Sequence, residues 1–334
     1  MKQILEKLIN HIDLTQDEMR EAFDRLMTGE MTQAQISAFI ALLCITQKSA
    51  SAVAGAASSM RRHATLIDTG GIPVVDTCGT GGDNTNTFNI STASAFVVTG
   101  AGVPVAKHGN KAVSSKCGSA DVLTELGLNI KAAPEIVEDC LNNVGIGFLF
   151  APLLHPAMKY ATPVRRELGI RTIFNMLGPL TNPAGATGQI LGVFSPDLTE
   201  LFANVLRTLG SKRVFVVYGN DGMDEITVTT TTSISELKNG KITTYEFDPL
   251  PFIGQYHKIE KLAGGTSTYN ADIIRRVLSG ERGACRDIVL LNAAAGIIAG
   301  EKADTFEVGF QKARESIDSG SAANILKKLL QQIS

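Results

Sequence analysis

The sequence predicts an α/β protein in which a small N-terminal α-helical domain precedes a larger α/β domain with a mostly parallel central sheet. Three observations predict this fold. Residues 2–66 carry only helical patterns, the composition changes at Gly70-Gly71, and from there strand-like and helical stretches alternate. Such alternation is typical of βαβ units, whose helices cover both faces of a parallel sheet. The 334 residues, 44% of them hydrophobic, are enough for two domains with a buried core.

Two capping boxes predict where helices begin in the N-terminal part. Thr15 with Glu18, and Thr32 with Gln35, have the spacing of such a box. Apolar residues then recur at helical spacing behind each box: Met19, Ala22, Phe23, Leu26 and Met27, and then Ile36, Phe39, Ile40 and Leu43. A short helix with one apolar stripe needs a partner surface. That surface is either the rest of this chain or a second copy of it.

The division between the domains is expected near Gly70, with residues 1–69 in the helical domain and residues 70–334 in the α/β domain. Strands are expected at 72–76, 103–106, 146–150, 214–218 and 288–292, and helices at 92–100, 120–126, 198–209 and 271–278. Residues 160–185 interrupt this alternation with helical character and an exit rich in glycine and proline. Parts of that segment are therefore expected to join the helical domain.

Composition and charge argue against several classes of partner. Lys and Arg number 31 and Asp and Glu 33, so the net charge of −2 gives no overall field for nucleic acid or an anionic membrane. Five widely spaced cysteines without a C-x-x-C pair argue against a disulfide framework and a zinc site. The N-terminus lacks the apolar core of a secretory signal, and no apolar run reaches the length of a membrane span. We expect a cytoplasmic protein that binds neither nucleic acid nor membranes.

A stretch rich in glycine and hydroxyl groups, DTCGTGGDNTNTFNISTAS, starts at Asp76 at the end of the first predicted strand. Its glycines are Gly79, Gly81 and Gly82. They permit positive φ and a close approach of the backbone to a ligand, so consecutive N–H groups can surround an anion. Taken alone, the glycines fit a tight turn equally well. The stretch runs into a predicted helix, which Ser91 and Thr92 are expected to cap while its first N–H groups face the anion.

Polar residues in this stretch are denser than capping requires. One hydroxyl suffices for a cap, yet Thr87, Asn89, Ser91 and Thr92 occur together. Asp83 is either an acceptor for a sugar hydroxyl or simply a turn residue.

The stretch KHGNKAVSSKCGSAD, at 107–121, follows the next predicted strand and offers a second wall for phosphate. It contains Lys107, Lys111, Lys116, Ser114, Ser115 and Ser119, the ammonium and hydroxyl groups that a di- or triphosphate needs. Lysine and serine also suit a solvated loop. Two such loops after successive strands favour a ligand site, because ligands bind at the carboxyl ends of parallel strands. For His108, a structural role in this loop is expected in preference to a role as a general base.

Two further clusters complete the candidate site. Asp224-Glu225 lies between two strand-like runs, and adjacent carboxylates beside a polyphosphate are the hard oxygen ligands that Mg²⁺ prefers. Away from a phosphate the pair would be an ordinary solvated turn. Ser91 could add a hydroxyl ligand. The run HPAMKYATPVRRELG supplies His155 and Arg165 among apolar neighbours, and an arginine on such a wall suits a planar carboxylate.

These stretches, with HPAMKYATPVRRELGIRTIFNMLGPLTNPA and GMDEIT, resemble the anthranilate phosphoribosyltransferase family over essentially the whole chain. The resemblance implies a fold like that of nucleoside phosphorylases and phosphoribosyltransferases, and a homodimer formed through the helical domains. It implies transfer of the phosphoribosyl group of 5-phosphoribosyl 1-diphosphate to the amine of anthranilate, in tryptophan biosynthesis. The products would be N-(5-phosphoribosyl)anthranilate and diphosphate.

The resemblance also implies roles for individual residues. Contacts to phosphoribosyl diphosphate would come from Gly79, Gly82, Asp83, Thr87, Asn89, Ile90, Ser91, Thr92, Lys107, His108, Gly109, Asn110, Lys111, Ala112, Val113, Ser114, Ser115 and Ser119. Contacts to anthranilate would come from Gly79, Asn110, His155 and Arg165. Two Mg²⁺ ions would be held by Ser91, Asp224 and Glu225. Lys111 and Cys117 stand where the family usually has arginine and serine, which bears on the affinity for the donor.

The implied chemistry follows from charge. Mg²⁺ and the N–H-rich loops would neutralise the departing diphosphate, while the C1–O bond breaks with oxocarbenium-like character and the amine attacks from the opposite face. The aromatic amine is unprotonated near neutrality, so no single general base is expected.

Two other functions are weighed against this one. A pyrimidine nucleoside phosphorylase shares the domain plan but would lack the paired acids. A non-catalytic relative that binds nucleic acid would show a basic stripe and a lost metal site. Asp224-Glu225 and the run HPAMKYATPVRRELG speak against the phosphorylase, and the slightly acidic net charge together with the retained acids speaks against the nucleic-acid binder.

Overall fold

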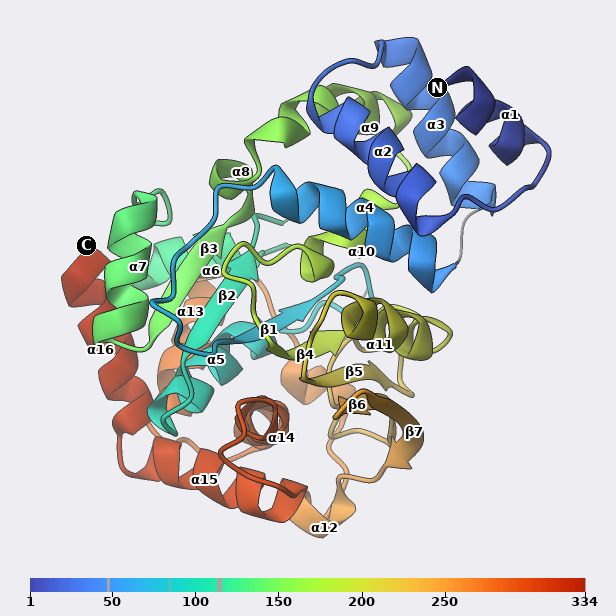
Figure 1. Ribbon diagram of the computed structural model, residues 1–334. Helices are drawn as coiled ribbons and strands as arrows, with labels where there is room; N and C mark the ends of the chain where they lie inside the picture. Colours follow the sequence, from blue (N-terminus) through green and yellow to red (C-terminus); the bar gives the residue numbers. More distant parts are fainter. Residues whose placement is uncertain (47–48, 84, 113–115, 334) are drawn as a thin grey trace.

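The computed structural model describes residues 1–46, 49–83, 85–112 and 116–333 (Figure 1). Within these residues, an N-terminal group of helices lies against a larger body built on a seven-stranded sheet. The N-terminal helices are α1 Lys2–Ile9, α2 Gln16–Met27, α3 Gln33–Thr46 and α4 Ala50–Arg62. The predicted fold class, a small helical domain followed by a larger α/β domain, is confirmed.

The sheet has the strand order β3-β2-β1-β4-β5-β6-β7. The strands are β1 Val75–Gly79, β2 Val105–Gly109, β3 Ile146–Phe150, β4 Gly188–Gly192, β5 Arg213–Gly219, β6 Thr232–Lys238 and β7 Lys241–Phe247. The first five in this order are parallel, and β6 and β7 form an antiparallel hairpin at one edge. The chain winds outward from β1 to β3 and then returns to the other side of β1 as β4. Ligands bind at the carboxyl ends of strands where the winding reverses in this way.

Helices cover both faces of the sheet (Figure 1). They are α5 Ile90–Gly100, α6 Ser119–Leu126, α7 Pro134–Asn143, α8 Ala151–Leu154, α9 Thr162–Leu168, α10 Phe174–Leu177, α11 Leu198–Thr208, α12 Leu250–Ile253, α13 Ser267–Leu278, α14 Ala284–Ala299, α15 Phe306–Asp318 and α16 Ser321–Ile333, with 3₁₀ turns η1 Pro156–Tyr160, η2 Gly178–Leu180 and η3 Ile259–Leu262. Among the described residues, no helix combines the length and apolar character needed to cross a membrane.

Two hydrophobic cores lie on opposite faces of the sheet, as the alternation of side chains along a strand requires. Ile190 of β4 belongs to the core built with α5, α13, α14, α15 and α16. Its neighbour Leu191 belongs to the core built with α11 and the N-terminal helices. The helical domain is thus anchored on one face of the sheet through α11, which α4 contacts directly. The chain itself supplies a partner surface for the N-terminal apolar stripes.

Both predicted capping boxes are present. The Glu18 amide donates to Thr15 Oγ1 at 3.2 Å, and the Gln35 amide donates to Thr32 Oγ1 at 3.3 Å. In return, the amides of Thr15 and Thr32 donate to the side chains of Glu18 and Gln35. The reciprocal bonds satisfy N–H groups that the first turn of a helix leaves free.

Residues from 156 to 180 pack among the N-terminal helices. Val164, Phe174 and Leu177 belong to the same core as Phe23 and Phe39. In addition, α9 contacts α3, and α10 contacts α4. The exact division of the chain between residues 69 and 70 stays a prediction.

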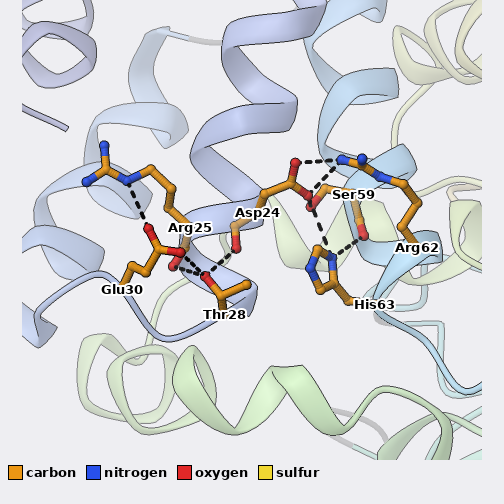
Figure 2. Close-up of polar contacts among 7 residues, drawn as sticks. All are labelled: Asp24, Arg25, Thr28, Glu30, Ser59, Arg62 and His63. Atoms are coloured by element: carbon orange, nitrogen blue, oxygen red, sulfur yellow. Dashed lines mark hydrogen bonds and ion pairs between the residues drawn. The ribbon is translucent and has the colours of Figure 1, made fainter.

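A polar cluster joins α2 to α4 in the helical domain (Figure 2). The Asp24 carboxylate accepts from Ser59 Oγ at 2.6 Å and from Arg62 Nη2 at 2.6 and 2.8 Å. His63 Nδ1 lies 3.7 Å from the same carboxylate and 2.9 Å from Ser59 O. Each oxygen of this carboxylate therefore faces a donor, and the cluster serves the packing of two helices.

The predicted strand at 288–292 is wrong, because these residues lie inside α14. Nearly all of α14 is buried, and it contacts α5, α15 and the sheet. A short apolar run that is buried on every side has the same pattern in a helix as in a strand. The predicted strands at 72–76 and 103–106 both begin and end too early, because β1 is Val75–Gly79 and β2 is Val105–Gly109. The last residues of both strands include a glycine, which made them look like part of the following loop. The β6–β7 hairpin, which turns at Asn239-Gly240, was not predicted.

Candidate functional site

Four strands end in glycine at the carboxyl edge of the sheet, and close packing explains two of these glycines. A Cβ on Gly192 would lie 1.5 Å from the carbonyl oxygen of Asp224, and a Cβ on Gly79 would lie 2.4 Å from Asp224 Oδ2. The loop that carries Asp224 therefore crosses directly over the ends of β1 and β4. Only residues without a side chain allow this approach. The acidic pair is brought to the point where the winding of the sheet reverses.

The two acids face backbone N–H groups from the glycine-rich stretch. Asp224 Oδ2 accepts from the Gly81 amide at 2.9 Å, and Glu225 Oε1 accepts from the Ser91 amide at 3.1 Å. Burial, and after it the neighbouring Asp83 carboxylate, raises the pKa of Asp224 to about 7. Burial and the Asp224 carboxylate raise the pKa of Glu225 well above its ordinary value. The charges of Asp83, Asp224 and Glu225 thus act on one another, and the Lys107 ammonium offsets part of that repulsion at Glu225.

The donor set fits a divalent cation that shares its ligands with a phosphate. Carboxylate oxygens of Asp224 and Glu225 and the hydroxyl of Ser91 are hard ligands. Among the described residues, no three His, Cys, Asp or Glu side chains converge closely enough to form a metal site by themselves. Mg²⁺ commonly takes one or two carboxylates and completes its octahedron with water and substrate phosphate, so such a site is incomplete without the substrate.

The start of α5 differs from the expected cap. The N-cap residue is Asn89, and its side chain makes no capping bond. Ser91 and Thr92 lie inside the first turn instead, so their predicted capping role is wrong. Asn89 is held from two sides, since its amide donates to Cys117 O at 3.1 Å and accepts from Asn270 Nδ2 at 3.0 Å. The side chain that would have capped the helix connects the two loops, and the first two N–H groups of α5 donate to Phe88 O and to Glu225 Oε1.

Lys107 lies inside β2 and not in the following loop. It is 3% exposed, and its ammonium donates to Thr77 O and, at 3.3 Å, to Ser91 Oγ. Burial lowers its pKa, while the charges of Asp76, Cys78 and Glu225 oppose that shift. This lysine supports the floor of the site from below, whereas sequence reasoning placed it beside Lys111 as a loop cation.

Two of the predicted site residues are imidazoles that contact each other. His108 Nε2 and His155 Nε2 lie 3.2 Å apart, and both side chains are buried. His108 Nδ1 lies 3.1 Å from Gly178 O, which has only lone pairs, so this nitrogen carries the hydrogen and Nε2 accepts. Burial, followed by the other imidazole, lowers the pKa of His108 to about 3, and burial lowers that of His155 to about 4. Both rings are neutral near pH 7.

Arg165 lies in α9 on the helical side of the site. Its guanidinium carbon is 5.0 Å from the centre of the Phe174 ring, and burial lowers its pKa. The stacked ring restricts the guanidinium while leaving its N–H groups in one plane, which suits a carboxylate.

The remaining predicted residues lie along the two loops. In the second loop, Asn110 O accepts from Ser119 Oγ at 3.2 Å, the Ala112 amide donates to Asp121 at 2.9 Å, and Lys111 is exposed. The predicted donor contacts Val113, Ser114 and Ser115 lie outside the described residues. In the first loop, Gly82 and Asp83 follow β1 and Thr87 forms a bridge with Ala263. Ile90 begins α5 and is buried in the core, and Gly109 is the last residue of β2.

Sequence reasoning missed three residues that touch this site. Arg171 donates from Nη2 to Gly82 O at 2.6 Å and stacks 4.8 Å from the Phe194 ring. Asp76 and Asn182 are buried and hydrogen-bonded to each other at 2.8 Å. Asp76 begins the glycine-rich stretch, but its burial could not be predicted from the sequence. Arg171 and Asn182 lie in the segment assigned only to helical packing.

Models of two sequence families match the chain. Residues 2–64 match the helical bundle domain of a glycosyl transferase family, and residues 71–323 match the α/β domain of the same family. An anthranilate phosphoribosyltransferase from Desulfosudis oleivorans is 53% identical over 330 residues, which cover 98% of this chain and 97% of the relative. One from Acetivibrio thermocellus is 50% identical over 331 residues, covering 99% of this chain and 96% of the relative.

Solved structures agree with the sequence relatives. The anthranilate phosphoribosyltransferase of Thermus thermophilus superimposes with a TM-score of 0.93 at 39% identity, covering 99% of both chains. The enzyme of Saccharomyces cerevisiae, in complex with PRPP and Mg, superimposes with a TM-score of 0.89 at 29% identity, covering 99% of this chain and 97% of that one. The fold, the site and the sequence identity of about half over nearly the whole chain lead to one conclusion: the chain belongs to the anthranilate phosphoribosyltransferase family.

Proposed function

We propose that this protein transfers the phosphoribosyl group of 5-phosphoribosyl 1-diphosphate to the amine of anthranilate, as a step of tryptophan biosynthesis. One observation carries the proposal: the glycine-rich loop, the start of α5 and the acids Asp224 and Glu225 meet at the winding reversal of the sheet. Full-length identity to anthranilate phosphoribosyltransferases supports this activity and gives no support to nucleoside phosphorolysis or nucleic-acid binding.

The donor end of the site is proposed to bind the diphosphate. N–H groups at the start of α5 and along the glycine-rich loop offer partial positive charge to an anion. Ser91, Asp224 and Glu225 are proposed to hold two Mg²⁺ ions, a view supported by the yeast relative solved with PRPP and Mg. When bound, Mg²⁺ supplies positive charge that stabilises the diphosphate as it leaves.

The acceptor end is proposed to bind anthranilate between Asn110, His155 and Arg165, beside Gly79. The stacked Arg165 guanidinium suits the carboxylate, and the neutral imidazoles present an uncharged wall to the aromatic ring. The yeast relative has been solved with 4-fluoroanthranilate, an analogue of this acceptor.

The proposed reaction exchanges one bond for another at C1 of the ribose. The C1–O bond breaks and diphosphate keeps the electron pair, while the amine nitrogen forms the C1–N bond and then loses a proton. The neutral imidazoles of His108 and His155 are proposed to lie at the acceptor end, where they do not protonate the amine. Holding two substrates in line supplies most of the acceleration in such a site.

The helical domain is proposed to form a homodimer. Helix α3 has a second apolar face besides the buried one, since Ala34, Ala38 and Ile45 are exposed along it, Ile45 to 68%. On the neighbouring α1 and the turn after it, Ile9 and Ile12 are exposed as well. A contiguous apolar face of this kind is typical of a protein interface. A cytoplasmic location is also proposed, supported by five cysteines that are all free thiols.

A fluorescence assay tests the activity. Anthranilate fluorescence should fall when the purified protein, phosphoribosyl diphosphate and Mg²⁺ are all present. Omitting the donor, or adding a chelator, should each abolish the change. Constant fluorescence in the complete mixture would overturn the proposed function.

A further inference from the structure

β1 and β2 pair only where they begin. Their ladder has the single register pair Val75 with Val105, whereas β1 with β4 and β2 with β3 each align over five pairs. In a parallel ladder that starts from Val75 and Val105, the next rung would join the N–H and C=O of Thr77 to Ala106 O and the His108 amide. That rung is replaced, so the two strands separate toward their carboxyl ends.

Side chains take three of the four backbone groups of the missing rung: Ala106 O, the His108 amide and Thr77 O. Asn182 Nδ2 donates to Ala106 O at 2.8 Å, and the His108 amide donates to Asp76 Oδ1 at 3.1 Å. Asn182 Nδ2 also donates to Asp76 Oδ2 at 2.8 Å, which joins the two replacements into one unit. The Ala184 amide donates to Asn182 Oδ1 at 2.9 Å and fixes the orientation of the side-chain amide. The polar atoms of Asp76 and Asn182 are thus fully engaged.

Lys107 completes the replacement. Its ammonium donates to Thr77 O, which would otherwise accept from the His108 amide, and to Ser91 Oγ at 3.3 Å. Asp76 is 0% exposed and Lys107 3% exposed. Burying a carboxylate, an amide and an ammonium costs free energy that a continued ladder would avoid. We therefore look for a function of the strand separation that would offset this cost.

The separation sets where the two candidate donor loops stand. Residues 79–83 continue from β1 and residues 109–112 continue from β2, so the gap between the strand ends becomes the gap between these loops. Asp76 fixes the backbone at His108, one residue before Gly109, and Lys107 holds the hydroxyl of Ser91. A closed ladder would bring the two loops together over the space assigned to the diphosphate.

We propose that Asp76, Asn182 and Lys107 form a polar wedge that fixes the spacing between the two donor loops, with Asp76 and Asn182 as positioning residues for the transfer. The proposal rests on the proposed function. It also links the segment after η2, which carries Asn182, to the geometry of the donor site. Loss of the wedge should weaken donor binding more than acceptor binding, because both loops contact the donor.

An exchange of side chains tests the wedge. Asp76→Asn sets an amide nitrogen against Asn182 Nδ2, and Asn182→Asp sets one carboxylate against another. Each single variant should raise the KM for phosphoribosyl diphosphate about tenfold, with a smaller change in the KM for anthranilate. The double variant restores one N–H···O bond between the two positions, so its donor KM should fall back toward the wild-type value.

Ser316→Ala is the matched control. Ser316 is a buried hydroxyl on α15 that donates to Val97 O of α5 at 2.8 Å, and none of its partners belongs to the wedge. Its replacement should lower the midpoint of thermal unfolding while the donor KM stays within about twofold of wild type. Should the single variants fail to fold, Asn182→Ser, which removes the amide without adding charge, takes their place with the same readout.

Three outcomes would overturn the wedge: single variants with the wild-type donor KM, a double variant no better than the worse single variant, or a control that raises the donor KM equally. Failure of the proposed function looks different, because the wild-type protein itself would then leave anthranilate unchanged.

Discussion

Asp24 and Asp224 are both partly buried carboxylates, but their surroundings differ in charge. Asp24 faces Arg62, a serine hydroxyl and an imidazole, so donors surround it (Figure 2). Asp224 receives one backbone N–H and otherwise faces the carboxylates of Asp83 and Glu225. The surroundings of Asp224 raise its pKa to about 7.

The contrast separates an acid that stabilises the fold from an acid that serves a ligand. The donors around Asp24 join α2 to α4. The surroundings of Asp224 and Glu225 disfavour their charge, which costs stability until a cation arrives. Carboxylates held in such a state, at a position fixed by glycine, indicate a site for positive charge.

The largest expected effect comes from neutralising the second pair of acids. Asp224→Asn combined with Glu225→Gln should lower Mg²⁺-dependent turnover more than about 100-fold, because a metal contributes several kcal/mol to such reactions. The same variant should unfold at the wild-type temperature or higher. Steady-state kinetics and thermal unfolding measure the two parts. Full activity in this variant would remove the metal role from these acids.

The second prediction compares histidines in the same two regions of the molecule. His63 lies beside Asp24, whereas His108 and His155 are buried against each other. The pKa values of the buried pair, about 3 and about 4, lie below the ordinary value, so the unfolded chain takes up protons first as the pH falls. The contribution of this pair to stability should therefore decline as the pH falls from about 6.5 to about 4.

The variant His155→Gln isolates that contribution. Between pH 7 and pH 5, its free energy of unfolding should fall by about 1 to 2 kcal/mol less than that of the wild type. Urea unfolding at the two pH values measures the difference, and His63→Gln is the matched control. Equal losses in His155→Gln and wild type would contradict a buried neutral pair.

The third prediction concerns the loop that touches Asp224. Arg171→Ala removes the bond to Gly82 O and the stacking on Phe194, so the glycine-rich loop should hold its position less well. The KM for phosphoribosyl diphosphate should rise about tenfold, as expected for the loss of a charged hydrogen bond. Arg166→Ala, which removes an exposed arginine from the same segment, should leave that KM unchanged. Equal effects of the two variants would point to net charge as the cause.

The smallest effect is expected at the first acid. Asp24→Asn weakens the bonds to Ser59 and Arg62, and should lower the free energy of unfolding by about 1 kcal/mol. Turnover should stay at the wild-type level. Chemical denaturation and the fluorescence assay together measure both quantities. A loss of turnover without a loss of stability would show that the helical cluster takes part in catalysis.

Much of this account was accessible from the sequence, and the reasons differ by element. Capping boxes and the apolar stripes behind them predicted α2 and α3, because both signals are local. Glycine-rich and lysine-rich stretches after strands predicted the loops of the site, and the pair Asp224-Glu225 was found by its chemistry. The strand predicted at 288–292 was wrong because a helix that is buried on all sides has no periodic pattern of apolar residues.

Other features depend on contacts that no local pattern records. Lys107 was expected in a loop, yet it belongs to a strand and holds Ser91 from below. Asp76 and Asn182 are far apart in the sequence, and no local motif around either residue predicts their hydrogen bond. Asn89 caps no turn with its side chain, because the amide is taken by Cys117 and Asn270. Tertiary contacts decided all three cases.

Thermal unfolding with Mg²⁺ and phosphoribosyl diphosphate, added singly and together, tests the central claim most directly. The wild-type protein should be stabilised most by the two ligands together, because the acids and the diphosphate complete one coordination site. The Asp224→Asn, Glu225→Gln variant should start at an equal or higher midpoint and lose the Mg²⁺-dependent part of the shift. A variant that keeps this part, or a wild type that shows none, would contradict the assignment of these carboxylates to the metal and the donor.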